Sequence, residues 1–207
     1  SYVQTNVQGT LNILRGALDA EVSGVIHTST SEVYGTAQFT PITEDHPLVG
    51  QSPYSASKIG ADMMAASFAR SYELPVITMR PFNTYGPRQS ERAVISTVIR
   101  QAIDDRCDTI QIGDITPTRD FNYVSDTAAA FMSVADLISE HAGTVFNAGS
   151  GQMVSIGEMV DIVIDITGCA KPIVRDTARI RPAKSEVLAL MADASRFSGY
   201  SGWTPQT

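Results

Sequence analysis

The sequence of 207 residues is poor in cysteine and in long apolar runs, and each shortage excludes a class of protein. Its two cysteines, Cys107 and Cys169, lie far apart and lack the paired spacing of metal ligands. Free structural thiols of this kind are typical of the reducing cytoplasm. No apolar run reaches the length of a membrane span, and no signal peptide is visible at the start. We therefore expect a cytoplasmic protein that does not enter a membrane.

Positive charge is also scarce. The chain carries 15 lysines and arginines against 22 aspartates and glutamates, which gives a formal net charge of −7 and a pI near 4.9. This balance argues against nonspecific binding to nucleic acids or to anionic membranes. The remaining composition, with 43% hydrophobic and 18% charged residues, is that of an ordinary globular protein without repeats.

The chemistry-bearing side chains are concentrated in residues 28–58. A short β-type run over 25–28 ends in three hydroxyls and one acid, at Ser29, Thr30, Ser31 and Glu32. A strand that ends in polar side chains is a frequent start of a functional loop. His27, within the run, is interpreted as a core histidine with satisfied hydrogen bonds rather than as a catalytic residue.

A helix is predicted over 53–71, because Ser52 can cap it and Pro53 suits its first turn. Tyr54 and Lys58 lie one helical turn apart, so the phenol and the ammonium share a face. The ammonium favours the phenolate and is expected to lower the pKa of Tyr54 toward the range of a general base. A tyrosine and a lysine at this spacing also occur by chance on solvated helices. The preceding strand and hydroxyl cluster are what indicate a proton-transfer site.

A second strand leads to a candidate ligand-binding edge. The apolar run over 75–80 continues directly into residues 81–88, whose sequence PFNTYGPR is rich in proline and glycine. A strand followed by such a loop is typical of the carboxyl edge of a parallel sheet, where open α/β folds bind ligands.

Residues 30–32 (TSE) followed by 54–58 (YSASK) resemble the extended short-chain dehydrogenase/reductase superfamily, and within it the nucleotide-sugar 4,6-dehydratases and their epimerase relatives. The resemblance continues through 80–87 (RPFNTYGP), 119–126 (RDFNYVSD) and 181–187 (RPAKSEV), so it covers nearly the whole chain. It implies an α/β fold with a Rossmann-like doubly wound parallel sheet and a smaller C-terminal substrate-binding lobe.

The resemblance also implies a division of the chain. Residues 1–86 would be the C-terminal half of the NAD-binding Rossmann domain and would include the catalytic tyrosine and lysine. Residues 87–207 would be mainly the substrate-binding lobe, with strands near 120–124 and 145–148 that return to the Rossmann sheet.

One departure from the family pattern is large. The glycine-rich turn that cradles the dinucleotide pyrophosphate in Rossmann domains does not occur in the sequence. We therefore expect a fragment that lacks roughly the first third of the enzyme. The segment 202–205 (GWTP) resembles the one that precedes a final family helix, so the fragment is expected to be short at this end too.

The family chemistry assigns roles to the first cluster. A nucleoside-diphosphate sugar is oxidised at C4 by NAD, loses water across C5 and C6, and regains the hydride at C6. Tyr54 would take the proton of the 4-hydroxyl, Lys58 would hold the nicotinamide ribose, and Thr30 would orient the 4-oxygen. Glu32 would remove the C5 proton. Ser31 stands where the dehydratases of deoxythymidine-diphosphate-glucose have an aspartate. A serine here resembles the GDP-mannose dehydratases, and the motifs favour these or the related dehydratases of N-acetylglucosamine nucleotides.

The resemblance implies further contacts with the two ligands. Besides Tyr54 and Lys58, the cofactor-binding residues would be Thr28, Pro81 and Phe82. The substrate-binding residues would be Asn83, Arg88, Arg119, Arg181 and Glu186. Arginines suit a diphosphate because the guanidinium fork pairs with phosphate oxygens, although Arg88 can equally be a solvated loop charge and Arg119 can pair with Asp120 or Asp126. The family also implies a homodimer.

Three alternatives remain open at this point. A nucleotide-sugar 4-epimerase would share Tyr54, Lys58 and Thr30, but epimerases usually lack the glutamate, so Glu32 favours a 4,6-dehydratase. A noncatalytic binding protein could be built on the same fold. The chain as given could also be an inactive fragment.

Overall fold

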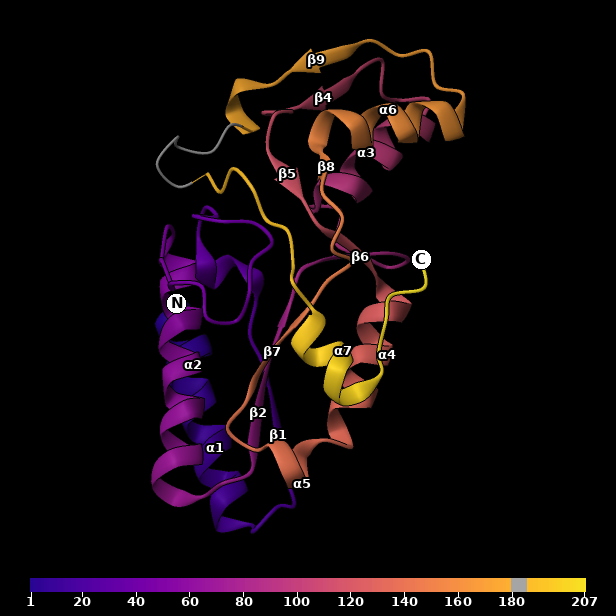
Figure 1. Cartoon of the computed structure of the whole chain (residues 1–207). Helices are drawn as coiled ribbons and strands as arrows, with labels where there is room; N and C mark the ends of the chain where they lie inside the picture. The colour runs from indigo at the N-terminus through magenta and orange to yellow at the C-terminus, as the bar shows by residue number, and fades with distance from the viewer. Residues whose placement is uncertain (180–185) are drawn as a thin grey trace.

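A three-stranded parallel sheet lies at the centre of the lower half of the molecule (Figure 1). The computed structural model describes residues 1–179 and 186–207. The strands run in the order β1 (Val25–Thr28), β2 (Val76–Pro81) and β7 (Val145–Ala148), with Thr28 opposite Met79 and Pro81 opposite Ala148. β2 is central, and its burial along nearly its whole length explains its continuous apolar pattern.

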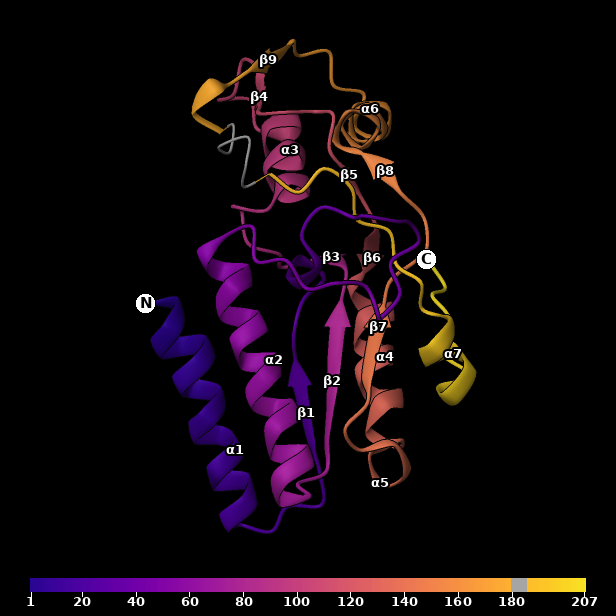
Figure 2. The ribbon, with the colours of Figure 1, turned by 60° about the vertical axis from the view of Figure 1, so that its left-hand side comes forward.

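Helices cover both faces of this sheet. Figure 2 shows α1 (Gly9–Asp19) and α2 (Pro53–Tyr72) on one side, and α4 (Val124–Ala135) and α7 (Ser195–Ser201) on the other. The largest buried side chains of the second layer, Phe146 and Phe197, pack with Trp203. Helices on both faces of a parallel sheet are the arrangement of a doubly wound α/β fold. This confirms the fold class predicted from the sequence.

The ends of α2 follow from its sequence. Ser52 Oγ accepts a hydrogen bond from the backbone N–H of Ser55, and Ser55 Oγ accepts one from the backbone N–H of Ser52. These two bonds form a capping box, with Pro53 in the first turn. The helix ends at Glu73, whose backbone is left-handed. At the start of the chain, α1 follows a π-helical turn over Val3–Gln8. Such turns are frequent at functional sites.

The upper lobe packs two helices against short strands (Figure 1). α3 (Val94–Ile103) and α6 (Ile156–Thr167) bury an apolar core with β4 (Ile110–Ile112), which pairs in parallel with β9 (Ile173–Arg175). α6 shows its boundaries plainly, with a capping box from Ser155 to Glu158 and a left-handed Gly168.

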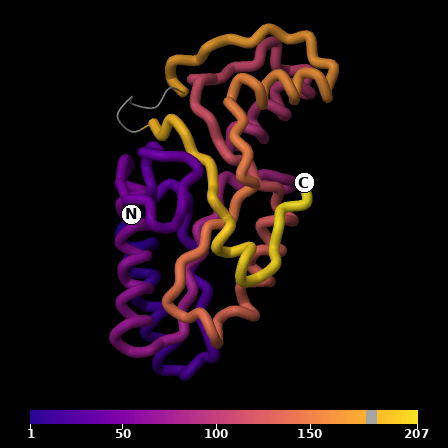
Figure 3. Tube along the Cα trace, in the orientation of Figure 1, coloured from indigo at the N-terminus to yellow at the C-terminus, as the bar shows by residue number. Residues whose placement is uncertain are grey.

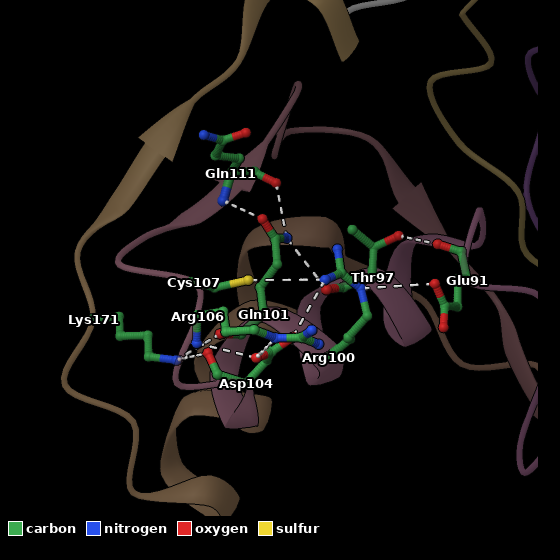
Figure 4. Close-up of polar contacts among 9 residues, drawn as sticks. All are labelled: Glu91, Thr97, Arg100, Gln101, Asp104, Arg106, Cys107, Gln111 and Lys171. Atoms are coloured by element: carbon green, nitrogen blue, oxygen red, sulfur yellow. Dashed lines mark hydrogen bonds and ion pairs between the residues drawn. The ribbon is translucent and has the colours of Figure 1, made fainter.

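Polar contacts fix the end of α3 within this lobe (Figure 4). Lys171 Nζ donates to the carbonyl oxygens of Gln101 and Asp104 at 2.9 and 2.8 Å. The Gln101 side chain is buried and exchanges hydrogen bonds with the backbone of Gln111 on β4. These bonds satisfy carbonyls that an α-helix leaves open at its C-terminus.

Two small ladders link the lobe to the sheet. β3 (Asn83–Tyr85) continues from β2 and pairs in parallel with β6 (Phe121–Tyr123), in a two-stranded sheet of its own. β5 (Thr118–Arg119) pairs antiparallel with β8 (Val154–Ser155). The tube in Figure 3 shows the chain passing between the two halves more than once, with the C-terminal segment returning toward α7. Over the described ranges, no helix combines the length and apolarity that crossing a membrane requires.

We expect Phe146→Ala to cost about 3–5 kcal/mol of unfolding free energy, because Phe146 is fully buried in the sheet core and its removal leaves a cavity. Urea unfolding monitored by circular dichroism measures this change. Met132→Ala is the matched control, since Met132 is 74% exposed on α4 and should change stability by at most about 0.5 kcal/mol. Equal effects of the two substitutions would contradict this description of the core.

Candidate active site

The carboxyl end of β1 meets the first turns of α2. Lys58 Nζ donates a hydrogen bond of 2.6 Å to the carbonyl oxygen of Thr28. Tyr54 lies one turn earlier on the same face of α2, and its ring makes an edge contact with Tyr2, the centroids being 5.7 Å apart. Both side chains are half-buried. The structure therefore brings the predicted phenol and ammonium to the same strand end.

A single turn of 3-10 helix (Ser31–Tyr34) carries the predicted acid. Thr30 begins this turn, and its hydroxyl accepts a hydrogen bond of 3.3 Å from the backbone N–H of Glu32. Glu32 is close enough to Tyr54 for its charge to affect the phenol. Ser31 is only 2% exposed. The turn thus directs Glu32 toward Tyr54 and buries Ser31.

The acid–base properties of Tyr54 differ from the prediction. Burial raises the pKa of Tyr54, the negative charge of Glu32 raises it further, and the neighbouring Thr30 hydroxyl lowers it by less. The expected lowering by Lys58 is therefore wrong for this structure. Burial lowers the pKa of Lys58 itself, against the opposing charge of Asp62. The raised pKa of Tyr54 favours the neutral phenol in the folded chain.

A chain of buried polar side chains lies directly beneath these groups. The Asp62 carboxylate contacts His27 Nε2 through Oδ1 at 3.0 Å, and Arg80 Nε and Nη2 through Oδ2 at 3.1 and 3.0 Å. Arg80 Nη1 donates to the Tyr34 hydroxyl at 3.0 Å, and this hydroxyl donates to Asn147 Oδ1 at 2.6 Å. His27 is thus a core histidine with a partner, as its sequence context indicated.

A cleft of about 410 Å³ opens between the carboxyl end of the sheet and the upper lobe. It is within the size range of small-molecule sites. Its wall combines predicted residues with others that the sequence did not single out. The polar and charged members are Glu32, Asn83, Thr84, Gln89, Arg92, Thr97, Gln111, Asp114, Arg119, Arg179 and Glu186.

One ion pair lies in the cleft wall. Arg119 Nη2 donates to Glu186 Oε1 at 2.8 Å, and Arg119 Nη1 donates to the carbonyl oxygen of Thr118 at 2.9 Å. Both charged side chains are more than four-fifths buried. The acid partners considered from the sequence were Asp120 and Asp126, but the Asp120 carboxylate instead accepts backbone N–H groups, including that of Ala192.

Other predicted residues lie away from the cleft. Arg88 is exposed and is not among the described residues that line the cleft. The other predicted residues outside this lining are Thr28, Thr30, Ser31, Tyr54, Lys58 and Pro81. Phe82 is only 2% exposed, because it packs in a core cluster with Val33, Tyr34 and Leu190. Arg181 lies outside the described residues.

Several residues of the site were missed from the sequence. Gln89 and Arg92 line the cleft, yet no motif marks them. Asn6 lies in the π-helical turn, and its side-chain amide donates to Ser57 Oγ at 2.9 Å, beside Tyr54. A signal for Asn6 did exist, since an unpaired amide on an otherwise apolar helical face needs a partner.

The parallel sheet, the phenol and ammonium on one helix face and the cleft at the strand ends define an α/β protein of the short-chain dehydrogenase/reductase type. The family follows from comparison with known sequences. The family model described as GDP-mannose 4,6 dehydratase matches residues 1–207, so the chain belongs to that family.

Individual relatives are similar over most of this chain. The low-salt glycan biosynthesis protein Agl12 of Haloferax volcanii is 38% identical over 168 residues, which are 81% of this chain and 53% of the relative. The crystal structure of DesIV, a dTDP-glucose 4,6-dehydratase from Streptomyces venezuelae with NAD bound, has a TM-score of 0.86 at 32% identity. That of UDP-glucuronic acid 4-epimerase from Bacillus cereus, with UDP-glucuronic acid and NAD, has a TM-score of 0.90 at 26% identity.

This chain corresponds to only part of the length of each relative. This chain is covered to 99% by both solved structures, but it covers 62% of DesIV and 63% of the epimerase. The chain therefore spans between about half and two thirds of the length of these relatives.

We expect Glu32→Gln to move the ionisation of Tyr54 to lower pH, because it removes the negative charge that disfavours the phenolate. Phenolate absorbance measures this titration, and subtracting the curve of Tyr54→Phe isolates Tyr54 from the other six of the seven tyrosines. Glu140→Gln, on an exposed acid of α5 (Ile138–His141), should leave the curve unchanged. An unchanged midpoint in Glu32→Gln would contradict the proximity of the two groups.

Proposed function

We propose that the protein is an NAD-dependent nucleotide-sugar 4,6-dehydratase, which oxidises C4, eliminates water across C5 and C6, and returns the hydride to C6. The observation that carries this proposal is the placement of Glu32. Its carboxylate lines the cleft, and its charge also acts on Tyr54, which is not among the described residues that line the cleft. Glu32 thus connects the cleft with the phenol, so two proton-transfer groups lie close together. A 4,6-elimination needs two such groups, one for the 4-hydroxyl and one for the C5 proton. Family membership and the similarity to DesIV support the same reaction class.

The cofactor contacts are consistent with the residues at the strand ends. Lys58 gives one ammonium hydrogen to Thr28, which leaves two hydrogens without a partner among the described residues and free for the hydroxyls of a ribose. Pro81 ends β2 at the same edge of the sheet. Thr28, Lys58, Tyr54 and Pro81 would therefore hold the nicotinamide half of NAD, with Phe82 supporting them from the core. When bound, NAD supplies a hydride acceptor at C4 and a hydride donor at C6.

The remaining roles fall to the side chains of this chain. Tyr54, once ionised, takes the proton of the 4-hydroxyl, and Thr30 orients the 4-oxygen. Glu32 takes the C5 proton, which the neighbouring carbonyl at C4 makes acidic, and gives a proton to the C6 hydroxyl, which leaves as water. Because the pKa of Tyr54 is raised in this structure, the ammonium of Lys58 one turn away is the group that would assist its ionisation on ligand binding.

The nucleoside diphosphate would lie in the cleft beyond Glu32. Asn83, Arg119 and Arg179 line this part, and α3 presents its first turn to it with no side-chain cap among the described residues. Backbone N–H groups at a helix N-terminus and arginine forks both favour phosphate oxygens. Glu186 holds Arg119 in place before ligand binds and can accept a hydroxyl of the ribose or the sugar. Arg88 and Arg181 stay predicted substrate contacts.

Two further properties belong to this proposal. Apolar side chains on the outer helices, among them Ile13 at 67% and Met63 at 49% exposure, would be covered in a homodimer. The free thiols Cys107 and Cys169 are consistent with a cytoplasmic enzyme. Sedimentation of the complete protein gives the oligomeric state directly.

The complete protein, incubated with NAD+ and a panel of nucleotide sugars, should convert one of them to a product lighter by one water, without net NADH. Mass spectrometry measures this conversion. In deuterated water, solvent deuterium should appear at C5, because Glu32 exchanges its proton with solvent. Isomerisation without mass change would instead establish a 4-epimerase, which the likeness to the UDP-glucuronic acid 4-epimerase keeps as the second candidate.

Variants of the two proton-transfer residues separate these activities. Glu32→Gln should reduce water loss about 10²–10⁴-fold, because the amide cannot take the C5 proton, whereas a 4-epimerase would tolerate it. Tyr54→Phe should reduce either activity to a similar degree. Glu140→Gln serves as the control and should have full activity. Unimpaired water loss in Glu32→Gln would remove Glu32 from the mechanism.

The diphosphate contact has its own test. We expect Arg119→Lys to weaken binding of a nucleoside diphosphate about tenfold or more, because a single ammonium cannot replace a bidentate guanidinium. Calorimetry with GDP, UDP and dTDP measures the loss and identifies the preferred base. Arg196→Lys is the matched control, since Arg196 pairs with Glu44 and Asp45 and is not among the described residues lining the cleft. Equal affinities of the two variants would place the diphosphate elsewhere.

A further inference from the structure

The reaction proposed above does not use Asp62, although this carboxylate lies next to its residues. Asp62 follows Lys58 by one turn of α2 and Tyr54 by two, so the three side chains occupy one helix face. Asp62 is 2% exposed, yet it carries a charge. A buried charge without a structural or chemical task is rare in proteins.

The partners of Asp62 come from both neighbouring strands. His27 on β1 lies 3.0 Å from Oδ1, and Arg80 on β2 binds Oδ2 through two nitrogens at 3.0 and 3.1 Å. An ionised carboxylate can only accept hydrogen bonds, so the proton of His27 is on Nε2. Burial would raise the pKa of Asp62, but the hydrogen bond from His27 and the charge of Arg80 outweigh it and leave the pKa below its usual value.

This network also determines where Lys58 can reach. His27 immediately precedes Thr28, whose carbonyl oxygen accepts the 2.6 Å hydrogen bond of Lys58. A shift of α2 along β1 that displaced Asp62 from His27 would therefore also displace Lys58 from Thr28. The Asp62–His27 and Lys58–Thr28 contacts lie one turn apart on α2 and one residue apart on β1. Together they set a single register between the helix and the strand.

Stability alone does not account for this arrangement. A buried ion pair is often no more stabilising than apolar residues of the same volume, because desolvation of the charges offsets their attraction. The charge of Asp62 does act on Lys58, where it opposes the effect of burial on the ammonium. Besides Tyr54 on the same helix face, the groups that face Asp62 and Lys58 are His27, Arg80 and the Ser29 hydroxyl. The Ser29 hydroxyl lowers the pKa of Asp62, although it lies outside hydrogen-bond geometry.

We infer that Asp62 is a positioning residue of the site: it fixes α2 on β1 and β2 and keeps the side chain of Lys58 beside Thr28 as an ammonium. The catalytic consequence rests on the proposed function, because an ammonium is the form that can assist ionisation of Tyr54 and bind ribose hydroxyls. The effect on Lys58 itself requires neither cofactor nor substrate.

Competitive labelling of amines with acetic anhydride over a pH series tests this inference in the protein without ligands. The sequence contains three lysines, Lys58, Lys171 and Lys184, so peptide mass spectrometry follows each separately. In Asp62→Asn the titration midpoint of Lys58 should fall, and its labelling at neutral pH should rise several-fold. Lys171, which binds carbonyl oxygens at the end of α3, should be unchanged.

Two more variants keep the test decisive. Asp62→Asn alone leaves the Arg80 charge buried and unpaired. The double variant, Asp62→Asn with Arg80→Gln, removes both charges together. It should also lower the titration midpoint of Lys58. Tyr34→Phe disturbs the far end of the network but leaves Asp62 charged, so it should not move the midpoint. An unchanged Lys58 midpoint in both Asp62 variants, or an equal fall in Tyr34→Phe, would overturn the inference.

The activity of the complete protein separates this inference from the proposed function. If the protein is a dehydratase, the pH profile of the double variant should shift relative to that of Tyr34→Phe. Dehydratase activity with an unmoved Lys58 midpoint and an unmoved profile would reject only the role of Asp62. A fall of the Lys58 midpoint in a protein without dehydratase activity would uphold the role of Asp62 and reject the proposed reaction.

Discussion

The arrangement of the lower half of the molecule depends on the burial of the Asp62 carboxylate. An ionised carboxyl group loses its hydration when it is buried, so charged or hydrogen-bonding partners have to replace the water. Here the partners come from β1, through His27, and from β2, through Arg80. Arg80 continues to Tyr34, in the turn that carries Glu32. Because every link has to stay at hydrogen-bond distance, the helix, both strands and the turn have one relative placement.

The site forms at the carboxyl edge of the sheet, where this arrangement of helix, strands and turn brings the side chains together. Parallel strands end at a common edge, and the loops that leave them there converge. Thr28 ends β1, and Glu32 and Asn83 follow β1 and β2 at this edge. The upper lobe closes over the edge with Arg119, Arg179 and Glu186, which come from segments distant in the sequence. The two short ladders between the halves, β3 with β6 and β5 with β8, hold the lobe close enough to form a cleft.

Much of this organisation could be predicted from local sequence signals. Ser52 and Pro53 marked the start of α2. The apolar runs over 25–28 and 75–80 predicted β1 and β2, and the family resemblance implied the strand that is β7. By contrast, Gln89 and Arg92 carry no local signal, because a polar or charged residue in a loop looks the same whether it faces solvent or a cleft. The partner of Arg119 was also missed, since Glu186 lies 67 residues away.

The sequence by itself determined the helices and strands and the placement of Tyr54 and Lys58 on one helix face, because these depend on hydrogen bonding and spacing within a few residues. The tertiary structure alone decided the electrostatics of the site. The sequence indicated a lowered pKa for Tyr54 from the nearby lysine, but in the folded chain burial and Glu32 raise it. Burial and the approach of side chains from separate elements are consequences of packing, and no spacing along the chain encodes them.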